Sequence, residues 1–153
     1  NRGTVVQIPS FIVPSVRVVD IETVMEVMED LNPIHVDEEL AKSLGLRGCV
    51  NQGPANIGYI VNMFVNWLGD PTAIKNLQFR NYSISCPGDY LESRGEVLQV
   101  DNSVTPPLLH CSFALVRPLT DGLDGNDVEV IAAGKAVVES TSDVSAYVEG
   151  ADA

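Results

Sequence analysis

The segment from Gly53 to about Leu68 most constrains the fold, because it predicts a helix that is apolar almost all the way round. Gly53 suits the N-cap and Pro54 the first helical position, where a proline loses only an N–H that has no partner within the helix. Apolar side chains form one face at helical spacing and fill most of the remaining surface: Ile57, Ile60, Val61, Phe64 and Leu68, then Met63, Val65 and Trp67. A helix of this kind is usually buried, so the rest of the chain has to cover it.

Four strands are predicted after the turn at residues 69–71, at roughly 74–85, 90–100, 108–117 and 128–140, with turn residues between them. Ahead of the helix, residues 5–19 are rich in β-branched side chains but broken by two prolines, which is typical of an edge strand or an extended arm. An antiparallel sheet and a buried helix each cover the other's apolar face. The expected fold class is therefore α+β, with an antiparallel β-sheet wrapped around a long central α-helix.

The length of 153 residues and the hydrophobic content of 45% suit one domain, expected over residues 1–140. Residues 141–153 are small, polar and acidic, and are expected to form a mobile tail. Residues 1–4 hold no apolar signal-peptide core and no initiator methionine, which is typical of a trimmed end. The longest apolar run, residues 57–68, is too short to cross a bilayer.

Charge and cysteine content limit the partners and the compartment. Twenty-one acidic against nine basic residues give a net charge of −12, which repels nucleic acid and anionic membranes. Acidic carriers such as coenzyme A would need a local basic patch, for which the candidates are Lys42, Arg47, Arg80 and Arg94. Three widely spaced cysteines fit neither a disulfide framework nor a zinc motif, and they favour a reducing, cytoplasmic compartment.

Residues 20–30 predict an amphipathic helix with Asp20 as its N-cap. Its apolar side chains recur at helical spacing and form one face: Ile21, Val24, Met28 and Leu31. A second, short helix is predicted over residues 37–44 and is stopped by Gly45.

A carboxylate and an imidazole, Asp30 and His35, stand five residues apart where the first of these helices stops. Asn32-Pro33 forces a turn between them, because proline disfavours helix at the residue before it. Two groups of this kind on one turn can act on a single water molecule, which suggests an enzyme.

The first of three blocks of residues, Asp30-x-Asn32-Pro33-Ile34-His35-x-Asp37, is specific, whereas Gly45 to Gly53 and Pro87-Gly88-Asp89 are supportive. Together they resemble the MaoC-like, or (R)-specific, enoyl-thioester hydratases and dehydratases of the hotdog fold, over about residues 20–140. The resemblance implies a hydro-lyase that interconverts trans-2-enoyl and (3R)-3-hydroxyacyl thioesters of coenzyme A. It implies no cofactor, and it implies a homodimer or a heterodimer with a related hotdog chain.

By this resemblance, Asp30 is the base that takes a proton from water, and His35 orients the water and shares in proton delivery. The Gly53 N–H stabilises the negative charge that develops on the thioester oxygen. Ala55 and Asn56 are further possible N–H donors at the helix start. The expected substrate contacts are Asn32, which also serves the turn, Gln52, Ala55 and Asn56.

Other interpretations stay open at this point. Taken singly, Asp30 suits a helix end that satisfies backbone N–H groups, and His35 suits a hydrogen-bonded loop. Family members commonly carry His-Gly where this chain has Gln52-Gly53, and Pro54 removes one N–H from the helix start. A non-catalytic hotdog subunit and a hotdog thioesterase are therefore the alternative functions.

Three further features favour structural interpretations. Met63, Phe64 and Trp67 suit plain core better than the border of an acyl tunnel. His110 has no second ligand at metal spacing. Residues 121–127 lack the order of an EF-hand, so they predict a solvated hairpin loop rather than a calcium site.

Overall fold

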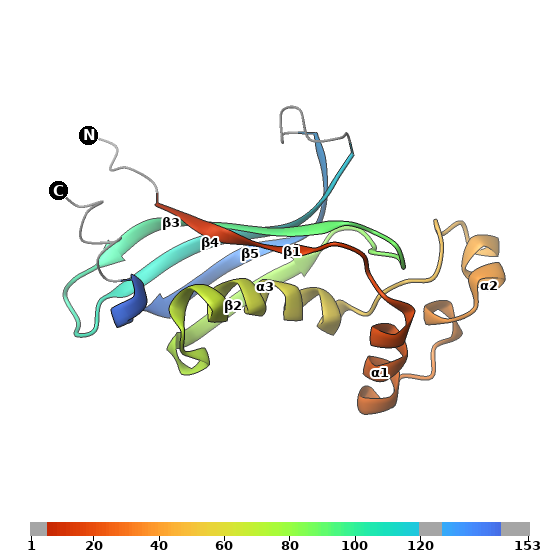
Figure 1. Ribbon diagram of the computed structural model, residues 1–153, viewed down its shortest axis with the longest axis horizontal. Coiled ribbons are helices and arrows are strands. Elements are labelled where there is room, and N and C mark those ends of the chain that lie inside the picture. Colours follow the sequence, from red (N-terminus) through yellow and green to blue (C-terminus); the bar gives the residue numbers. More distant parts are fainter. Residues whose placement is uncertain (1–5, 120–126, 145–153) are drawn as a thin grey trace.

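A long helix, α3 (Gly53–Leu68), lies across one face of a five-stranded antiparallel sheet in the computed structural model (Figure 1). The structure describes residues 6–119 and 127–144. The predicted α+β class, a sheet wrapped around one central helix, is confirmed. The end of α3 is set by Gly69, which adopts a positive φ of 72° that glycine tolerates and closes the last turn.

The sheet has the order β1-β3-β4-β5-β2, so the first two strands of the chain form its two edges. The strands are β1 (Val6–Val13), β2 (Ile74–Asn81), β3 (Leu91–Asp101), β4 (Leu108–Pro118) and β5 (Val128–Glu139). β1 pairs with β3 and shifts register between Ile8 and Phe11, where Pro9 cannot donate to the ladder. The predicted edge strand and all four later strands are therefore present.

The core lies between α3 and the sheet. Phe64 is fully buried and meets Phe113 of β4 edge to face, with ring centroids 5.9 Å apart. Met63 and Trp67 belong to the same buried cluster, as the core interpretation expected. This packing fixes the axis of α3, and with it the position of its first residue.

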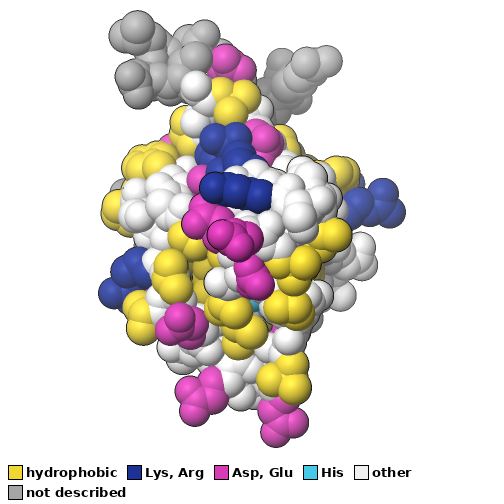
Figure 2. Space-filling view, turned by 90° about the vertical axis from the view of Figure 1, so that its right-hand side faces the viewer, with side chains coloured by type: hydrophobic (Ala, Val, Ile, Leu, Met, Phe, Trp, Pro, Cys, Tyr) yellow, Lys and Arg dark blue, Asp and Glu magenta, His cyan; other side chains and the backbone are white. Residues whose placement is uncertain are grey.

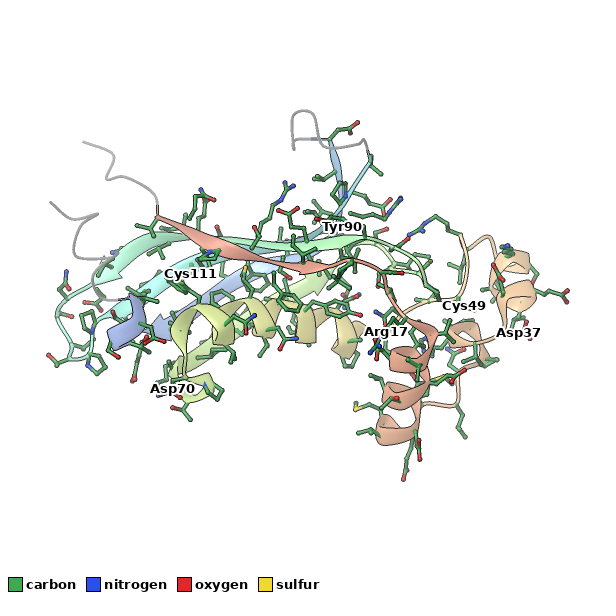
Figure 3. All side chains as sticks on the ribbon, viewed as in Figure 1. Arg17, Asp37, Cys49, Asp70, Tyr90 and Cys111 are labelled. Carbon is green, nitrogen blue, oxygen red and sulfur yellow. The ribbon has the colours of Figure 1, made fainter. Side chains whose placement is uncertain are left out.

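Outside α3 and the sheet, the described residues also form two helices and two short 3-10 turns: α1 (Val18–Met28), η1 (Pro33–His35), α2 (Glu38–Ser43) and η2 (Pro71–Ala73). α1 and α2 lie beyond the end of α3 and of the sheet (Figure 1). Figure 3 shows Arg17 at the start of α1, near Cys49 in the connection that leads to α3.

The predicted start of α1 is wrong. The N-cap is Arg17, and Asp20 lies within the first turn. Asp20 accepts two hydrogen bonds from the Arg17 guanidinium, each 2.8 Å long, so its carboxylate is occupied by a side chain instead of capping the backbone. The N-cap of α3 is likewise Gln52, one residue before the predicted Gly53.

The apolar face predicted for the first helix is mostly exposed. Ile21 alone among the residues of α1 is buried, while Met28 is 56% and Leu31 88% exposed. The helical period is present, but α1 stands beyond the sheet end and has little core to face.

Three predictions concern residues outside the described ranges. The hairpin loop at 121–126, residues 1–4 and most of the predicted tail, residues 145–153, are not described. The described start of that tail packs against the domain, since Thr141 Oγ1 donates to the Leu68 carbonyl at 2.7 Å and Val144 is buried. Within residues 6–119 and 127–144, no helix is both long and apolar enough to cross a membrane.

Candidate active site

Asp30 and His35 form the centre of the site, with Asp30 Oδ2 2.9 Å from His35 Nε2. The Asp30 side chain is 35% exposed, whereas that of His35 is 9% exposed. A solvent-facing carboxylate is thus held against a nearly buried imidazole, and the structure brings together the two residues that the sequence singled out.

The end of α1 aims Asp30 at His35. Glu29 caps the helix in the left-handed region, with φ of 52°, and this reverses the chain direction. Asp30 Oδ1 then accepts the Asn32 N–H at 3.1 Å, which leaves Oδ2 for the imidazole. Asp30 therefore fills the helix-end role and the paired role at once.

Asn32 serves the turn, as expected from its place before Pro33. Its Oδ1 accepts the Ile34 N–H at 3.2 Å and so caps η1, the 3-10 turn that carries His35. The side chain is used within the turn, and no substrate contact is needed to explain it.

The second nitrogen of His35 determines how many protons the pair holds. Nδ1 lies 2.5 Å from the Val50 carbonyl, which can only accept, so Nδ1 carries a hydrogen. The short contact of Nε2 with Asp30 Oδ2 needs a second proton between those two atoms. The pair therefore holds one exchangeable proton. The Val50 contact connects the pair to the irregular segment that leads into α3.

The start of α3 offers a single free N–H. Pro54 has none, and the N–H groups of Ala55 and Asn56 both donate to the Gln52 carbonyl, at 3.1 and 3.2 Å. Among the described residues, nothing accepts from Gly53. The tight first turn therefore uses the Ala55 and Asn56 N–H groups internally, and their expected part as substrate donors stays a prediction.

Gln52 and Asn56 point into the protein. Gln52 is 3% exposed, and its Nε2 donates to the Ile21 carbonyl of α1 at 3.1 Å. Asn56 accepts from the buried Ser85 hydroxyl at 2.8 Å. These hydrogen bonds join α3 to α1 and to the chain after β2, and the substrate contacts expected of the two side chains stay a prediction.

The two supportive sequence blocks meet through an ion pair. Arg47, in the block from Gly45 to Gly53, donates from both terminal nitrogens to the carboxylate of Asp89, in the block Pro87-Gly88-Asp89. Asp89 is nearly buried and also accepts the Cys86 N–H at 2.8 Å. This pair fixes the connection between α2 and α3, and sequence spacing gave no sign of it.

A cavity of about 290 Å³ opens beside His35. Its lining is mixed, with apolar side chains and one guanidinium: Val18, His35, Val36, Glu38, Arg47, Gly48, Cys49, Cys86 and Pro87. Figure 2 shows hydrophobic side chains gathered on this end of the molecule, with a small area of histidine between them and acidic groups above. The site is therefore open to an apolar or amphipathic ligand.

The cysteines in this cavity are thiols. Burial raises the pKa of Cys49 and of Cys86 above the ordinary value, which disfavours the nucleophilic thiolate. Cys111, within the sheet (Figure 3), has a pKa raised to about 12 by burial. All three cysteines are free, and no group of three potential metal ligands occurs among the described residues.

Most candidates for a basic patch are already paired. Lys42 contacts Glu38, Arg47 contacts Asp89 and Arg94 contacts Glu92. Arg80, on the edge strand β2, is exposed and has no ion pair within the described part of the chain. It is the one candidate left for an acidic carrier.

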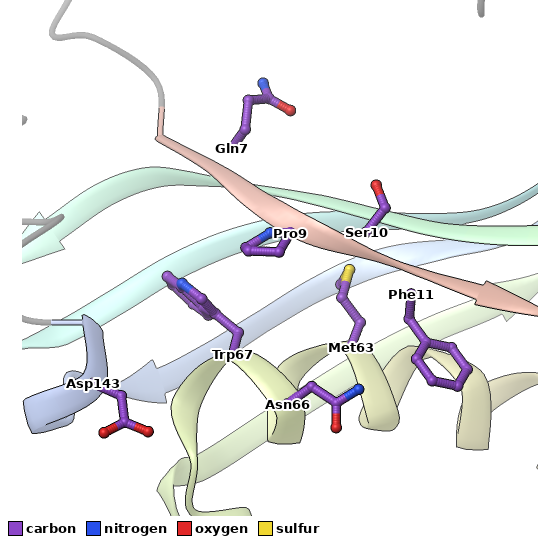
Figure 4. Close-up of a pocket in the computed structure, with 8 residues that line it drawn as sticks. All are labelled: Gln7, Pro9, Ser10, Phe11, Met63, Asn66, Trp67 and Asp143. Carbon is purple, nitrogen blue, oxygen red and sulfur yellow. The ribbon is translucent and has the colours of Figure 1, made fainter.

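A second cavity, of about 300 Å³, lies between β1 and the far half of α3 (Figure 4). Met63 and Trp67 point from α3 toward β1 and line it together with Phe11. Its lining also contains polar side chains, among them Asn66 and Asp143. This cavity is separate from the Asp30–His35 pair, which lies at the opposite end of α3.

One residue beside the site was missed in the sequence. Asn81 ends β2, and a methyl group added at Gly53 would lie 3.0 Å from its Nδ2. Only the packing of β2 alongside α3 brings residues 28 positions apart together, and local sequence carries no signal of that.

The chain is similar to one protein family and to several solved structures. A family model described as "MaoC like domain" matches residues 15–106. No curated protein matches the chain significantly. Among solved structures, a "MaoC-like dehydratase" is 22% identical with a TM-score of 0.72, over 92% of this chain and 41% of that one. The chain thus spans about two fifths of that dehydratase.

Two further structures are similar over most of both chains. The (R)-hydratase PhaJ1 from Pseudomonas aeruginosa is 17% identical with a TM-score of 0.70, covering 90% of this chain and 89% of its own. The ChsH1-ChsH2 complex from Mycobacterium tuberculosis contains a chain 17% identical with a TM-score of 0.66, covering 91% and 98%. At these identities the likeness establishes the fold.

Proposed function

The chain belongs to the MaoC-like domain family and has the hotdog fold, and on that premise we propose that it is a hydro-lyase acting on acyl thioesters. It interconverts trans-2-enoyl and (3R)-3-hydroxyacyl thioesters, with coenzyme A as the carrier. The observation that carries the proposal is the Asp30–His35 pair, which Val50 ties to the start of α3.

Asp30 and His35 supply the proton transfers of the reaction. Water binds to the exposed carboxylate and the imidazole, and Asp30 takes its proton as the new C–O bond forms at C3 of the enoyl group. The proton that the pair already holds passes to C2. One proton enters the pair and one leaves it, so the pair returns to its starting state. The two groups therefore act as a unit.

The start of α3 stabilises the intermediate charge. Attack at C3 moves an electron pair onto the thioester oxygen, which becomes an enolate. The Gly53 N–H, at the positive end of a 16-residue helix, donates a hydrogen bond to that oxygen. The cavity beside His35, with Val18, Val36 and Pro87 on its walls, gives the thioester a route to the pair.

The sheet edges support a dimer as part of the proposal. β2 is an unpaired edge whose Phe79 is 40% exposed, whereas β1 is interrupted by Pro9 and a register shift. We expect β2 to pair with a second hotdog domain, either a copy of this chain or a related one. One of the similar solved structures, ChsH1-ChsH2 from Mycobacterium tuberculosis, is itself a complex. Size-exclusion chromatography with light scattering measures the mass of the assembly.

The test is hydration of crotonyl-coenzyme A, followed by loss of the alkene absorbance, with Asp30→Asn and His35→Ala as variants. Each is expected to lower kcat by at least ~100-fold while the far-ultraviolet circular dichroism stays unchanged. Glu22→Gln, an exposed carboxylate on α1, is the matched control and should keep full activity. Unchanged turnover in both site variants would remove the proposed mechanism.

A non-catalytic subunit is the second candidate, and the single free N–H at α3 favours it. Such a chain would shape the acyl pocket of a catalytic partner. In that case the purified chain alone would hydrate none of a series of enoyl-coenzyme A esters of increasing length. Addition of a co-purifying hotdog chain would restore the activity. Release of free thiol, measured with a thiol reagent, would instead identify a thioesterase.

A further inference from the structure

Asn81 lies beside the one free N–H of α3. It is the last residue of β2, where it pairs with Ala132 of β5. Side chains alternate along a strand, and Leu77 of β2 packs against the core, so Asn81, four residues on, faces the same side as Leu77. β2 runs back alongside α3 (Figure 1), which brings its end to the start of the helix.

The amide group of Asn81 points at Gly53. A Cβ on Gly53 would lie 3.0 Å from Asn81 Nδ2 and 3.9 Å from its Cγ. Gly53 has no positive φ, so backbone conformation does not demand glycine there. A side chain at this position would instead crowd the Asn81 amide, which lies close to the helix start.

The Asn81 amide has no competing role in the described structure. The side chain is exposed, and none of the described residues accepts a hydrogen bond from it. An amide N–H that is held in place by the end of a strand, yet free to donate, is available to a ligand.

The site needs such a donor. Stabilisation of an oxyanion in acyl chemistry generally uses two or more N–H groups directed at one oxygen. Pro54 has no N–H, and Ala55 and Asn56 donate to Gln52, so the backbone here supplies Gly53 only. A donor from outside the helix would restore the missing hydrogen bond.

We propose that Asn81 Nδ2 donates the second hydrogen bond to the thioester oxygen, so that Asn81 and the Gly53 N–H together form the oxyanion site. The assignment rests on the proposed hydration of enoyl thioesters. Because the amide is neutral, it stabilises the enolate without any change in charge of the site when substrate leaves.

Turnover provides the first test. Asn81→Ala is expected to lower kcat by about 100-fold with little change in KM, the usual effect of losing one oxyanion donor. Asn81→Asp has nearly the same shape but places a negative charge beside the enolate, so its kcat should fall below that of Asn81→Ala. A purely structural role would not give this order.

Asn76→Ala is the matched control. Asn76 is an exposed asparagine on the same strand, but it lines a groove on the opposite face with Gln78 and Lys135. Its replacement should leave kcat unchanged.

A binding measurement separates the donor from the reaction. 2,4-Hexadienoyl-coenzyme A absorbs at longer wavelength when hydrogen bonds polarise its carbonyl, and the Asp30→Asn background prevents turnover during the measurement. The red shift should be strong in Asp30→Asn, equal in Asp30→Asn/Asn76→Ala, and at least halved in Asp30→Asn/Asn81→Ala.

Each outcome decides between the two claims. A red shift that depends on Asn81, in a chain that hydrates no enoyl thioester, supports the donor and overturns the hydratase function. Hydration that is unaffected by Asn81→Ala overturns the donor and leaves the function standing. Absence of both the red shift and turnover overturns both.

Discussion

Asp89 holds the Arg47 guanidinium with both carboxylate oxygens, each 2.8 Å from a nitrogen. The contact joins the connection before α3 to the turn before β3. Asp89 raises the pKa of Arg47 through a hydrogen bond and its charge, so the guanidinium stays charged throughout the working range. The pair thereby sets where Val50 and Gly53 stand relative to His35.

Removal of Arg47 is therefore expected to destabilise the protein. Arg47→Ala leaves the nearly buried Asp89 carboxylate without its cation, which should cost about 2 kcal/mol of unfolding free energy, less than for a fully buried pair because Arg47 is partly exposed. Lys42→Ala is the control, since its exposed pair with Glu38 is worth no more than about 0.5 kcal/mol. Urea unfolding measures both, and equal losses would contradict a structural role of Asp89.

Asn32 is expected to act through its cap on the turn that carries His35. Asn32→Ala removes the acceptor of the Ile34 N–H and should cost about 1 kcal/mol, together with a fall in kcat as His35 loses its fixed position. Asn32→Asp keeps an oxygen acceptor and should retain most of the stability and activity. Thermal unfolding and crotonyl-coenzyme A hydration check the two variants, and loss of activity in Asn32→Asp at unchanged stability would point to a direct substrate contact.

Two apolar residues of the first predicted helix should respond oppositely to substitution. Ile21 is fully buried, so Ile21→Ala is expected to cost about 2–4 kcal/mol. Leu31 is 88% exposed, and Leu31→Ala should change the unfolding free energy by less than about 0.5 kcal/mol. Urea unfolding of the purified chain gives both values, and a large loss for Leu31→Ala would show that the surface is covered.

Glu29 has a positive φ at the end of α1, where glycine is favoured. Glu29→Gly should therefore stabilise the protein by about 0.5–1 kcal/mol. Glu26→Gly, in the interior of the same helix, should destabilise it by about 1 kcal/mol. Far-ultraviolet circular dichroism in urea follows both variants. A destabilised Glu29→Gly would mean that the Glu29 side chain makes a contact that outweighs the backbone strain.

The sequence predicted the sheet, α3 and the Asp30–His35 turn because each depends on local signals. Alternating and helical periods identify the strands and α3. Gly69 ends α3, and Pro33 begins the turn that carries His35, each through its own backbone preference. The pair of Asp30 and His35 lies within six residues, so a single turn suffices to bring it together.

The rest of the site depends on contacts between distant segments. Whether the apolar face of α1 is buried is decided by where the sheet ends, and the period alone does not contain that information. Asn81 reaches Gly53 only because β2 packs alongside α3. The contacts of Gln52 with Ile21 and of Arg47 with Asp89 likewise form only when segments far apart in the sequence pack together.

The two halves of the site differ in how firmly the hydrophobic core anchors them. Gly53 begins a helix anchored in the core, whereas Asp30 follows a helix with one buried side chain and lies outside the sheet. Regions with few buried apolar side chains open at lower free energy than the core. In mild urea the Asp30–His35 pair should therefore be lost by local unfolding while the domain stays folded, and loss of the proposed activity should precede denaturation.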